Sequence, residues 1–375
     1  MAGIYLHIPF CKRACHYCNF HFSTTTKDVE PMVECMMKEI ILQNNYTSED
    51  IATIYFGGGT PSILQPQYID QLLKTIYQQF KVLPDAEITL EANPDDITTE
   101  RLKAWKAIGI NRLSIGIQSF REEDLLWMNR AHNAVQAKEC IRLAQQEGID
   151  NITIDLIYGV PNLSDEQWME NIHTALSLNI PHLSCYALTV EPKTALDKMI
   201  KQQKKEPVDT DKQAAQFIIL MNELKEAGFQ HYEISNFAKP GFRSKHNSSY
   251  WQGKPYIGIG PSAHSYNGLA RQWNIANNAL YIQSIHQNTI PSEEELLSAD
   301  QRYNEFVMIS LRTIEGLNLN TLRTLFGEGK LGYTVLAIQR WIEEQYVVEI
   351  NNSYCLTTTG KLMADAIASD LFIVD

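Results

Sequence analysis

The segment Tyr5-Leu-His-Ile-Pro-Phe-Cys11-Lys-Arg-Ala-Cys15-His-Tyr-Cys18 places three thiols within eight residues, directly after a short apolar run. Thiolates are soft donors that suit zinc or iron–sulfur clusters. A structural zinc site normally has four ligands, but Phe20 stands two residues after Cys18 and no further cysteine follows closely. We therefore expect Cys11, Cys15 and Cys18 to bind a 4Fe–4S cluster with one iron left open. Zinc binding, or three ordinary buried thiols, is the alternative.

An open iron suits a small chelating ligand. The amino and carboxylate groups of S-adenosylmethionine (SAM) form such a chelate and would place its sulfonium beside the cluster. In that arrangement the cofactor carries the difficult chemistry, and the protein supplies the geometry. The cysteine segment therefore predicts SAM as a second cofactor.

Composition and charge limit the classes of protein. The chain has 375 residues, of which 44% are hydrophobic and 20% charged, as in folded globular proteins. A formal charge of −12 argues against a broad nucleic-acid surface, so we expect no nucleic-acid partner. We find no apolar stretch long enough to span a membrane and no secretory signal. Seven cysteines, three of them clustered, indicate the reducing cytoplasm rather than a secreted disulfide framework.

Short apolar runs alternate with helical patterns through the first two-thirds of the chain. Such alternation indicates parallel βαβ units. The helical segments include Pro66–Phe80, Thr98–Ile108, Asn133–Glu147 and Asp165–Leu178. The strand-like runs are Gly3–Ile8, Ile51–Phe56, Glu87–Glu91, Arg112–Ile117, Asn151–Ile157 and His182–Ala187.

Polar or glycine-rich residues stand at or near the ends of these runs. They are the cysteine segment, Gly57-Gly58-Gly59-Thr60-Pro61, Glu91, Gln118 and Asp155. In a barrel the carboxyl ends of the strands form one ring, where function collects. We therefore predict an α/β fold with a partial (β/α)6 parallel barrel over residues 1–237. A doubly wound sheet is the alternative.

The last third of the chain divides into two segments. Residues 238–290 are rich in Gly, Pro, Ser and aromatics, and we expect a loop-rich segment across the barrel mouth. In residues 291–375, helical stretches precede two short strands around Asn351-Asn352-Ser353 and a final helix, which predicts a winged-helix-like α+β domain. This segment has 13 Asp and Glu against 6 Lys and Arg, so protein contact or packing on the barrel is favoured over DNA binding.

The Cys-x3-Cys-x2-Cys pattern resembles the radical SAM superfamily, and more narrowly its coproporphyrinogen III oxidase-like branch, over nearly the whole chain. The resemblance implies that Tyr5, Gly58 and Glu91 contact the cluster-bound SAM. Six further residues correspond to positions that hold a second SAM in the oxidase: Tyr17, Gly59, Thr60, Gln118, Arg130 and Asp155.

Each of these residues also has an ordinary structural explanation. Gly57–Gly59 alone is typical of a turn, although glycines also let backbone amides approach a charged ligand. Gln118 can donate and accept hydrogen bonds. Asp155 lies in an apolar strand, where an acid is costly unless paired, and Arg130 is expected to pair with it or to hold a ligand carboxylate.

Two features depart from the oxidase. Phe20 stands where the oxidase motif has a fourth cysteine, and the N-terminal extension that precedes its cluster is expected to be missing. The segment His246-Asn-Ser-Ser-Tyr250-Trp251 resembles the haem-binding motif of HemW-type haem chaperones. Imidazole is a common axial ligand of haem iron, and Tyr and Trp offer flat apolar surface to a porphyrin. Alternatively, His246 is an internally hydrogen-bonded loop histidine, and Tyr250 and Trp251 only pack on the barrel.

The leading hypothesis is a haem chaperone that carries haem as cargo to haem-dependent, membrane-associated proteins. The resemblance also implies a homodimer, and we assign no catalytic residue. The second hypothesis is an oxygen-independent coproporphyrinogen III oxidase, and the third a zinc-stabilised interaction protein. The segment Gly258-Ile-Gly-Pro-Ser-Ala-His264 is expected to line the mouth, without a ligand role for His264.

Overall fold

The computed structural model describes residues 1–374, and its main feature is one twelve-stranded mixed sheet. Six parallel strands form its centre in the order in which they occur along the chain, without the reversal of a doubly wound sheet. The sixth strand pairs with β8 (Asn236–Ala238) instead of closing onto the first, so the barrel is open. The predicted partial barrel is therefore confirmed. Its strands are β1 (Ala2–Ile8), β2 (Ile51–Gly58), β3 (Val82–Ala92), β4 (Arg112–Gln118), β5 (Ile152–Tyr158) and β6 (His182–Ala187).

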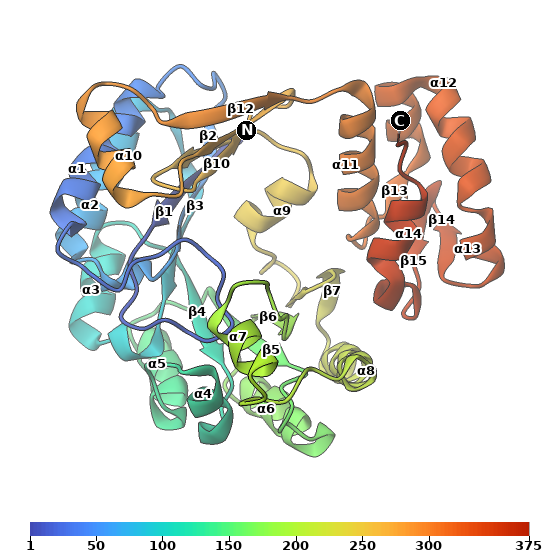
Figure 1. Ribbon diagram of the computed structural model, residues 1–375, viewed down its shortest axis with the longest axis horizontal. Helices are drawn as coiled ribbons and strands as arrows, with labels where there is room; N and C mark the ends of the chain where they lie inside the picture. The colour runs from blue at the N-terminus through green and yellow to red at the C-terminus, as the bar shows by residue number, and fades with distance from the viewer. Residues whose placement is uncertain (375) are drawn as a thin grey trace.

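Helices cover the outer face of this curved sheet (Figure 1). In α5, buried residues recur at the i, i+3, i+4, i+7 spacing of a helix face: Ala137, Cys140, Ile141 and Ala144. Capping boxes at Asn133 and Ser164 fix the starts of α5 and α6. The helices are α1 (Val29–Leu42), α2 (Pro66–Gln79), α3 (Thr99–Ala107), α4 (Glu122–Met128), α5 (Ala134–Gln146), α6 (Asp165–Ser177), α7 (Ala195–Lys201) and α8 (Thr210–Glu226).

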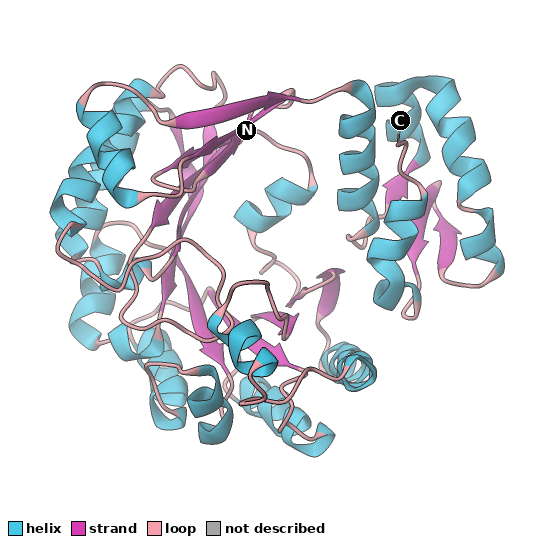
Figure 2. Cartoon of the chain, in the orientation of Figure 1, coloured by secondary structure: helices cyan, strands magenta, loops and turns pink. Residues whose placement is uncertain are grey.

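Both edges of the barrel sheet are extended by later strands (Figure 2). Beyond β6 lies β8, which is antiparallel to β6, and beyond β8 lies β7 (Gln230–Glu233), which is antiparallel to β8. Beyond β1 lies β9 (Tyr256–Ile259), parallel to it. The antiparallel strands β10 (His264–Tyr266), β11 (Ala270–Asn274) and β12 (Ser292–Leu296) follow, with α10 (Asn278–His286) between the last two in sequence. The prediction of a loop-rich segment over 238–290 is therefore wrong, because much of it is sheet and helix.

Helix α9 (Lys245–Trp251) lies inside the curve of the sheet, at the end opposite the cysteine segment (Figure 1). Its first turn is held by Glu87, whose carboxylate accepts hydrogen bonds from the backbone N–H groups of Lys245 and His246 at 3.1 and 3.0 Å. Glu87 lies in the middle of β3, before its carboxyl end, and Thr53, near the start of β2, contacts the same helix. Helix α9 therefore does not cross the barrel mouth, whereas Asn278 of the same predicted segment lies 2.7 Å from Nε2 of His21, near the cysteines, so the predicted crossing by the rest of the segment stays a prediction.

The C-terminal unit has its own core, which includes Tyr303, Leu322, Trp341 and Ile367. Its three-stranded sheet has the order β13-β15-β14, and the hairpin turns at Asn351 and Asn352, whose φ values of 50° and 61° are typical of a type I′ turn. The predicted domain boundaries, between residues 237 and 238 and between residues 290 and 291, stay predictions. The elements are α11 (Ala299–Leu311), β13 (Leu317–Asn318), α12 (Leu319–Ala337), α13 (Gln339–Glu343), β14 (Val347–Ile350), β15 (Ser353–Leu356) and α14 (Ala364–Asp370).

In the described part of the chain, no helix is both long and apolar enough to cross a membrane.

Candidate functional site

The cysteine loop, residues 9–23, lies at the carboxyl ends of the barrel strands. The backbone N–H of Cys11 donates to the carbonyl of Ser23 at 3.0 Å, which closes the base of the loop. On its far side, the Asn129 side chain donates to the carbonyl of Ala14 at 2.9 Å. The loop is therefore anchored to itself and to the end of α4, so its thiols are held over the barrel.

Two side chains from other loops contact the thiols. The Thr60 hydroxyl donates to the sulfur of Cys11 at 3.3 Å, and Nη1 of Arg130 lies 3.3 Å from the sulfur of Cys15. Burial raises the pKa of the Cys11 thiol to about 11 and also raises the pKa of Cys18, so neither is ionised at neutral pH without a further positive charge. Cysteine ligands lose their protons when they bind metal, and both donors would stabilise the resulting thiolates.

All three thiols line one cavity of about 410 Å³, which we call the cysteine cavity. Within residues 1–374, no three His, Cys, Asp or Glu side chains converge closely enough to bind a single metal ion directly. In a 4Fe–4S cluster, by contrast, each thiolate binds a different iron. Three thiols around a shared cavity, without a fourth, therefore fit a cluster better than a tetrahedral zinc ion.

The glycine turn after β2 packs against the cysteine loop. A Cβ atom at Gly59 would lie 2.6 Å from the carbonyl oxygen of Phe10, so only glycine allows this approach. Its N–H donates to the carbonyl of Ile8 at 2.9 Å. Gly58 has a φ of 105°, a conformation that favours glycine. The turn is thus fixed beside the thiols.

The structure brings together all the residues predicted to contact SAM except Tyr5. The Tyr5 ring packs against Gly57, where an added Cβ atom would lie 2.8 Å from its Cε2 atom. The Tyr5 hydroxyl is 3.3 Å from Nδ1 of His7. Tyr5 lines a different cavity, described below. The predicted residues that line the cysteine cavity are Tyr17, Gly58, Gly59, Thr60, Glu91, Gln118, Arg130 and Asp155.

Two carboxyl groups in this cavity have raised pKa values. Burial raises the pKa of Glu91 to about 8, although the Tyr55 hydroxyl donates to it at 2.8 Å and opposes the shift. Burial likewise raises the pKa of Asp155 to about 6, against the favourable charges of Arg130 and Arg112. The cavity therefore offers carboxyl groups that become charged more readily when a cation, such as an ammonium group, binds beside them.

Arg130 is the most connected cation of the cavity. Besides Cys15, it donates through Nη2 to the side-chain oxygen of Asn93 at 2.8 Å and to the carbonyl of Gly116 at 2.7 Å. Within the described residues no ion pair joins Arg130 to Asp155, although the charge of Arg130 acts to lower the pKa of that carboxyl against the effect of burial, so the alternative role of Arg130 towards a ligand carboxylate stays a prediction. Asn93 is a residue of the cavity that was not predicted, although it follows Glu91 by two residues at the end of a strand.

His246 is buried in the barrel with both ring nitrogens engaged. Nδ1 lies 2.7 Å from the Thr53 hydroxyl oxygen and Nε2 2.8 Å from that of Tyr250, and only 1% of the residue is exposed. Its ring stacks on Tyr55 with centroids 4.9 Å apart. Burial lowers its pKa to about 3, so it is neutral. Its predicted role as an axial ligand stays a prediction, and it requires one of these two hydrogen bonds to break, because one ring nitrogen must bind the iron.

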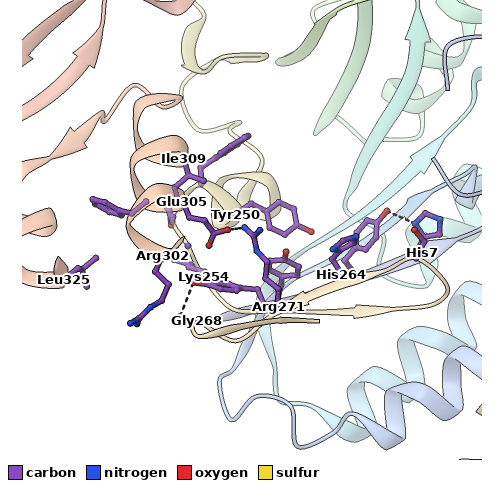
Figure 3. A pocket seen from close by; sticks show the side chains of 18 of the residues that line it. His7, Tyr250, Lys254, His264, Gly268, Arg271, Arg302, Glu305, Ile309 and Leu325 are labelled. Carbon is purple, nitrogen blue, oxygen red and sulfur yellow. Dashed lines mark hydrogen bonds and ion pairs between the residues drawn. The ribbon is translucent and has the colours of Figure 1, made fainter. Parts of the chain in front are cut away.

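A second cavity, of about 870 Å³, lies between the extended sheet and the C-terminal unit (Figure 3). We call it the inter-unit cavity. Tyr250 and Trp251, the other two predicted haem residues, line it, together with side chains from β10, β11, α11 and α12. Asn19 and Phe20 line both cavities. This cavity could not be predicted from local sequence patterns, because its walls come from segments far apart in the chain.

Comparisons with known proteins first identify the superfamily and the fold. Residues 5–175 match the Radical SAM superfamily. The structure resembles that of the Escherichia coli coproporphyrinogen III oxidase HemN, with a TM-score of 0.86 and 22% identity over 99% of this chain and 90% of that chain. At that identity the likeness shows the fold alone.

Similar sequences narrow the class further. The haem chaperone HemW of Bacillus subtilis is 32% identical over 371 residues, 98% of each chain. The HemW of E. coli is 31% identical over 390 aligned positions, covering 100% of this chain and 98% of its own. This chain therefore belongs to the HemW family within the radical SAM superfamily.

Proposed function

We propose that this protein is a haem chaperone, which binds haem as cargo and passes it to haem-dependent proteins. Its full-length relatives carry the name of haem chaperones. The observation that carries the proposal is the inter-unit cavity, whose volume suits a cofactor-sized ligand and which contains Tyr250 and Trp251. Aromatic rings there offer flat apolar surface to a porphyrin.

The cysteine cavity would hold the 4Fe–4S cluster through Cys11, Cys15 and Cys18, with SAM on the open iron. A reduced cluster with bound SAM supplies one-electron chemistry. The protein's own residues orient these groups: Thr60 and Arg130 donate to the thiols, and Glu91 is placed for the methionyl ammonium group. A second SAM stays a prediction, at Tyr17, Gly59, Thr60, Gln118, Arg130 and Asp155.

The alternative function is oxidation of coproporphyrinogen III, because the E. coli oxidase has the same fold. Phe20 argues against it, because this residue occupies the place of the oxidase's fourth cysteine and is 66% exposed between the two cavities. A large exposed apolar side chain there suits contact with an apolar cargo.

We expect the protein that receives the haem to be a membrane-associated haem protein. We expect this chain to act in the cytoplasm. Each of the seven cysteines is unpaired in the structure, as a reducing compartment requires. A homodimer is part of the same proposal.

The proposal is tested by haem transfer under anaerobic conditions. Protein loaded with one haem is mixed with an apo-cytochrome, and the haem spectrum of the acceptor is followed. We expect transfer faster than spontaneous release, which is measured with an excess of a haem-scavenging globin. A second sample receives coproporphyrinogen, SAM and a reductant, and protoporphyrinogen formation at an enzymatic rate would contradict the chaperone proposal.

A further inference from the structure

We propose that Thr53 is a positioning residue for the haem ligand. It holds the ring of His246 with Nε2 directed towards the inter-unit cavity, where the hydroxyl group of Tyr250 covers that nitrogen until haem binds. The proposal rests on the proposed function and on the predicted role of His246 as the axial ligand of the iron. Thr53 and Tyr250 then decide which nitrogen of His246 meets the iron.

The Nδ1 side of His246 faces strands β1 and β2 of the sheet. Nδ1 lies 2.7 Å from Oγ1 of Thr53, which belongs to β2. A Cβ atom at Gly3 in β1 would lie 2.7 Å from that same Oγ1 and 3.3 Å from Nδ1 of His246, so a larger residue would press on both side chains. Because the two strands close off this side of the ring, the iron of a haem cannot approach Nδ1.

The face of the His246 ring and its backbone are held as well. Tyr55 stacks on the ring with centroids 4.9 Å apart and planes inclined by 24°. The Tyr55 hydroxyl in turn donates to Glu91 at 2.8 Å, which fixes the tyrosine. The backbone N–H of His246 donates to Glu87 at 3.0 Å. The ring therefore keeps one orientation inside the barrel.

The opposite nitrogen, Nε2, is directed towards the inter-unit cavity. It lies 2.8 Å from the hydroxyl oxygen of Tyr250, whose side chain belongs to the wall of that cavity (Figure 3). Tyr5 lines the same cavity, and its ring centroid is 6.5 Å from that of His246. His246 thus lies directly behind two tyrosines of the cavity wall. A turn of the Tyr250 side chain would open Nε2 to the cavity and leave the contact with Thr53 in place.

The protonation of imidazole gives Thr53 its role. Neutral histidine carries one ring proton, and iron binds the nitrogen without it. When Nε2 binds iron, the proton is on Nδ1 and needs an acceptor, which Oγ1 of Thr53 provides. Histidines that bind metals almost always donate their other ring N–H to such a partner, which fixes the tautomer and the orientation of the ring. The Thr53 contact is therefore the one that is kept, and the Tyr250 contact is the one that is lost.

The test is an anaerobic haem titration of the full-length protein with its cluster. Thr53→Val keeps the shape of the side chain and removes the acceptor. We expect it to bind haem at least about 10-fold more weakly, with a changed Soret band and a changed electron paramagnetic resonance spectrum of ferric haem. Thr53→Ser should restore the wild-type affinity and spectrum.

Thr89→Val is the matched control. Thr89 lies in the neighbouring strand β3 and is fully buried, and among residues 1–374 its Oγ1 has no hydrogen-bond partner. The same substitution there removes a hydroxyl group from the barrel without removing a hydrogen bond. This variant should bind haem as wild type does. Equal effects of Thr53→Val and Thr89→Val would overturn the proposal.

Protoporphyrin IX without iron distinguishes the positioning of the ligand from damage to the cavity. It has the ring and the carboxylates of haem, but it offers His246 no metal to bind. We expect Thr53→Val to bind this porphyrin with wild-type affinity. Equal weakening of haem and of the iron-free porphyrin would show that the cavity has changed, and it would contradict a role through the iron ligand.

Tyr250→Phe tests the cover over Nε2. It keeps the aromatic ring and removes the hydroxyl group that contacts His246. We expect haem to bind about 2- to 10-fold faster in stopped-flow mixing, the factor that corresponds to one net hydrogen bond. An unchanged or slower rate would overturn this part of the proposal.

The outcomes separate the proposal from the function on which it rests. If wild type shows no saturable haem binding, the proposed function itself fails. If wild type binds one haem and His246→Ala has the same affinity and spectrum, His246 is not the ligand, so the role of Thr53 fails although the chaperone function stands. If His246→Ala loses the wild-type spectrum but Thr53→Val keeps both affinity and spectrum, Thr53 does not position the ring.

Discussion

Arg130 lies with Nη1 3.3 Å from the sulfur of Cys15 and Nη2 2.7 Å from the carbonyl oxygen of Gly116. One guanidinium group therefore joins a predicted cluster ligand to the end of β4. A planar fork can make both contacts at once, and a lysine ammonium cannot.

We expect Arg130→Lys to lower the iron content of anaerobically reconstituted protein by about half or more, because the contact to Cys15 or to β4 is lost. Iron and sulfide analysis, together with the cluster absorbance, measures this change. The exposed Arg142→Lys serves as the matched control and should retain its iron. Full iron content in Arg130→Lys would show that this contact does not support the cluster.

Gly59→Ala tests how closely the glycine turn approaches the cysteine loop. The added Cβ would lie 2.6 Å from a backbone oxygen, so the loop must shift. We expect a loss of about 1–3 kcal/mol in unfolding free energy, together with reduced cluster binding. Gly332→Ala is the control, since nothing lies within 4 Å of its added Cβ and it belongs to α12. It should stabilise the protein by about 1 kcal/mol, and equal effects of both changes would contradict the packing described.

The raised pKa of Glu91 predicts a pH dependence of the cofactor-free protein. In the folded state this pKa is about 8, against 4.5 for an unperturbed glutamate. Stability from this group is complete below about pH 4.5 and is lost as the pH rises towards 8, because ionising the buried carboxyl is unfavourable.

Glu91→Gln should therefore remove part of this loss. We expect the variant to be more stable than wild type at pH 9 by about 1–3 kcal/mol, a range that allows for water in the cavity, and to be equal at pH 4. Chemical unfolding of the cofactor-free proteins at both pH values gives the comparison. The exposed Glu123→Gln should leave the pH profile unchanged. A profile of Glu91→Gln parallel to that of wild type would show that Glu91 is ionised normally.

The local pattern of apolar and polar residues was enough to predict the barrel strands and most residues of the cysteine cavity. The six strands begin and end within a few residues of the predicted runs, with β3 the exception, since it starts at Val82 rather than Glu87. Each residue predicted at a strand end lies at the same rim because parallel strands share their direction. The C-terminal hairpin followed from Asn351 and Asn352, which favour the left-handed turn it requires.

The remainder depends on pairing between distant segments. Helix α9 is short, and Glu87, which holds its first turn, lies 159 residues before His246. The pairing of β9 with β1 also joins opposite parts of the chain. No local spacing reports such contacts, so the segment of His246 was predicted as a loop and the inter-unit cavity was missed.

The two cavities predict that cluster and haem binding are separable. Cys15 lines the cysteine cavity, whereas Tyr250 and Trp251 line the inter-unit cavity. Cys15→Ser should remove the cluster and SAM binding, and its haem affinity should stay within about threefold of wild type, a difference of less than 1 kcal/mol. Equilibrium dialysis with labelled SAM and a haem titration measure the two properties on one preparation. Loss of both would mean that haem binds at the cluster site or depends on it.

The most direct measurement of the central claim is an anaerobic haem titration of wild-type protein whose iron and sulfide have first been counted. The account predicts about four irons and four sulfides per chain, one saturable haem, and cluster absorbance that is unchanged at saturation. A single zinc in place of the irons would contradict it, and so would haem uptake that never saturates.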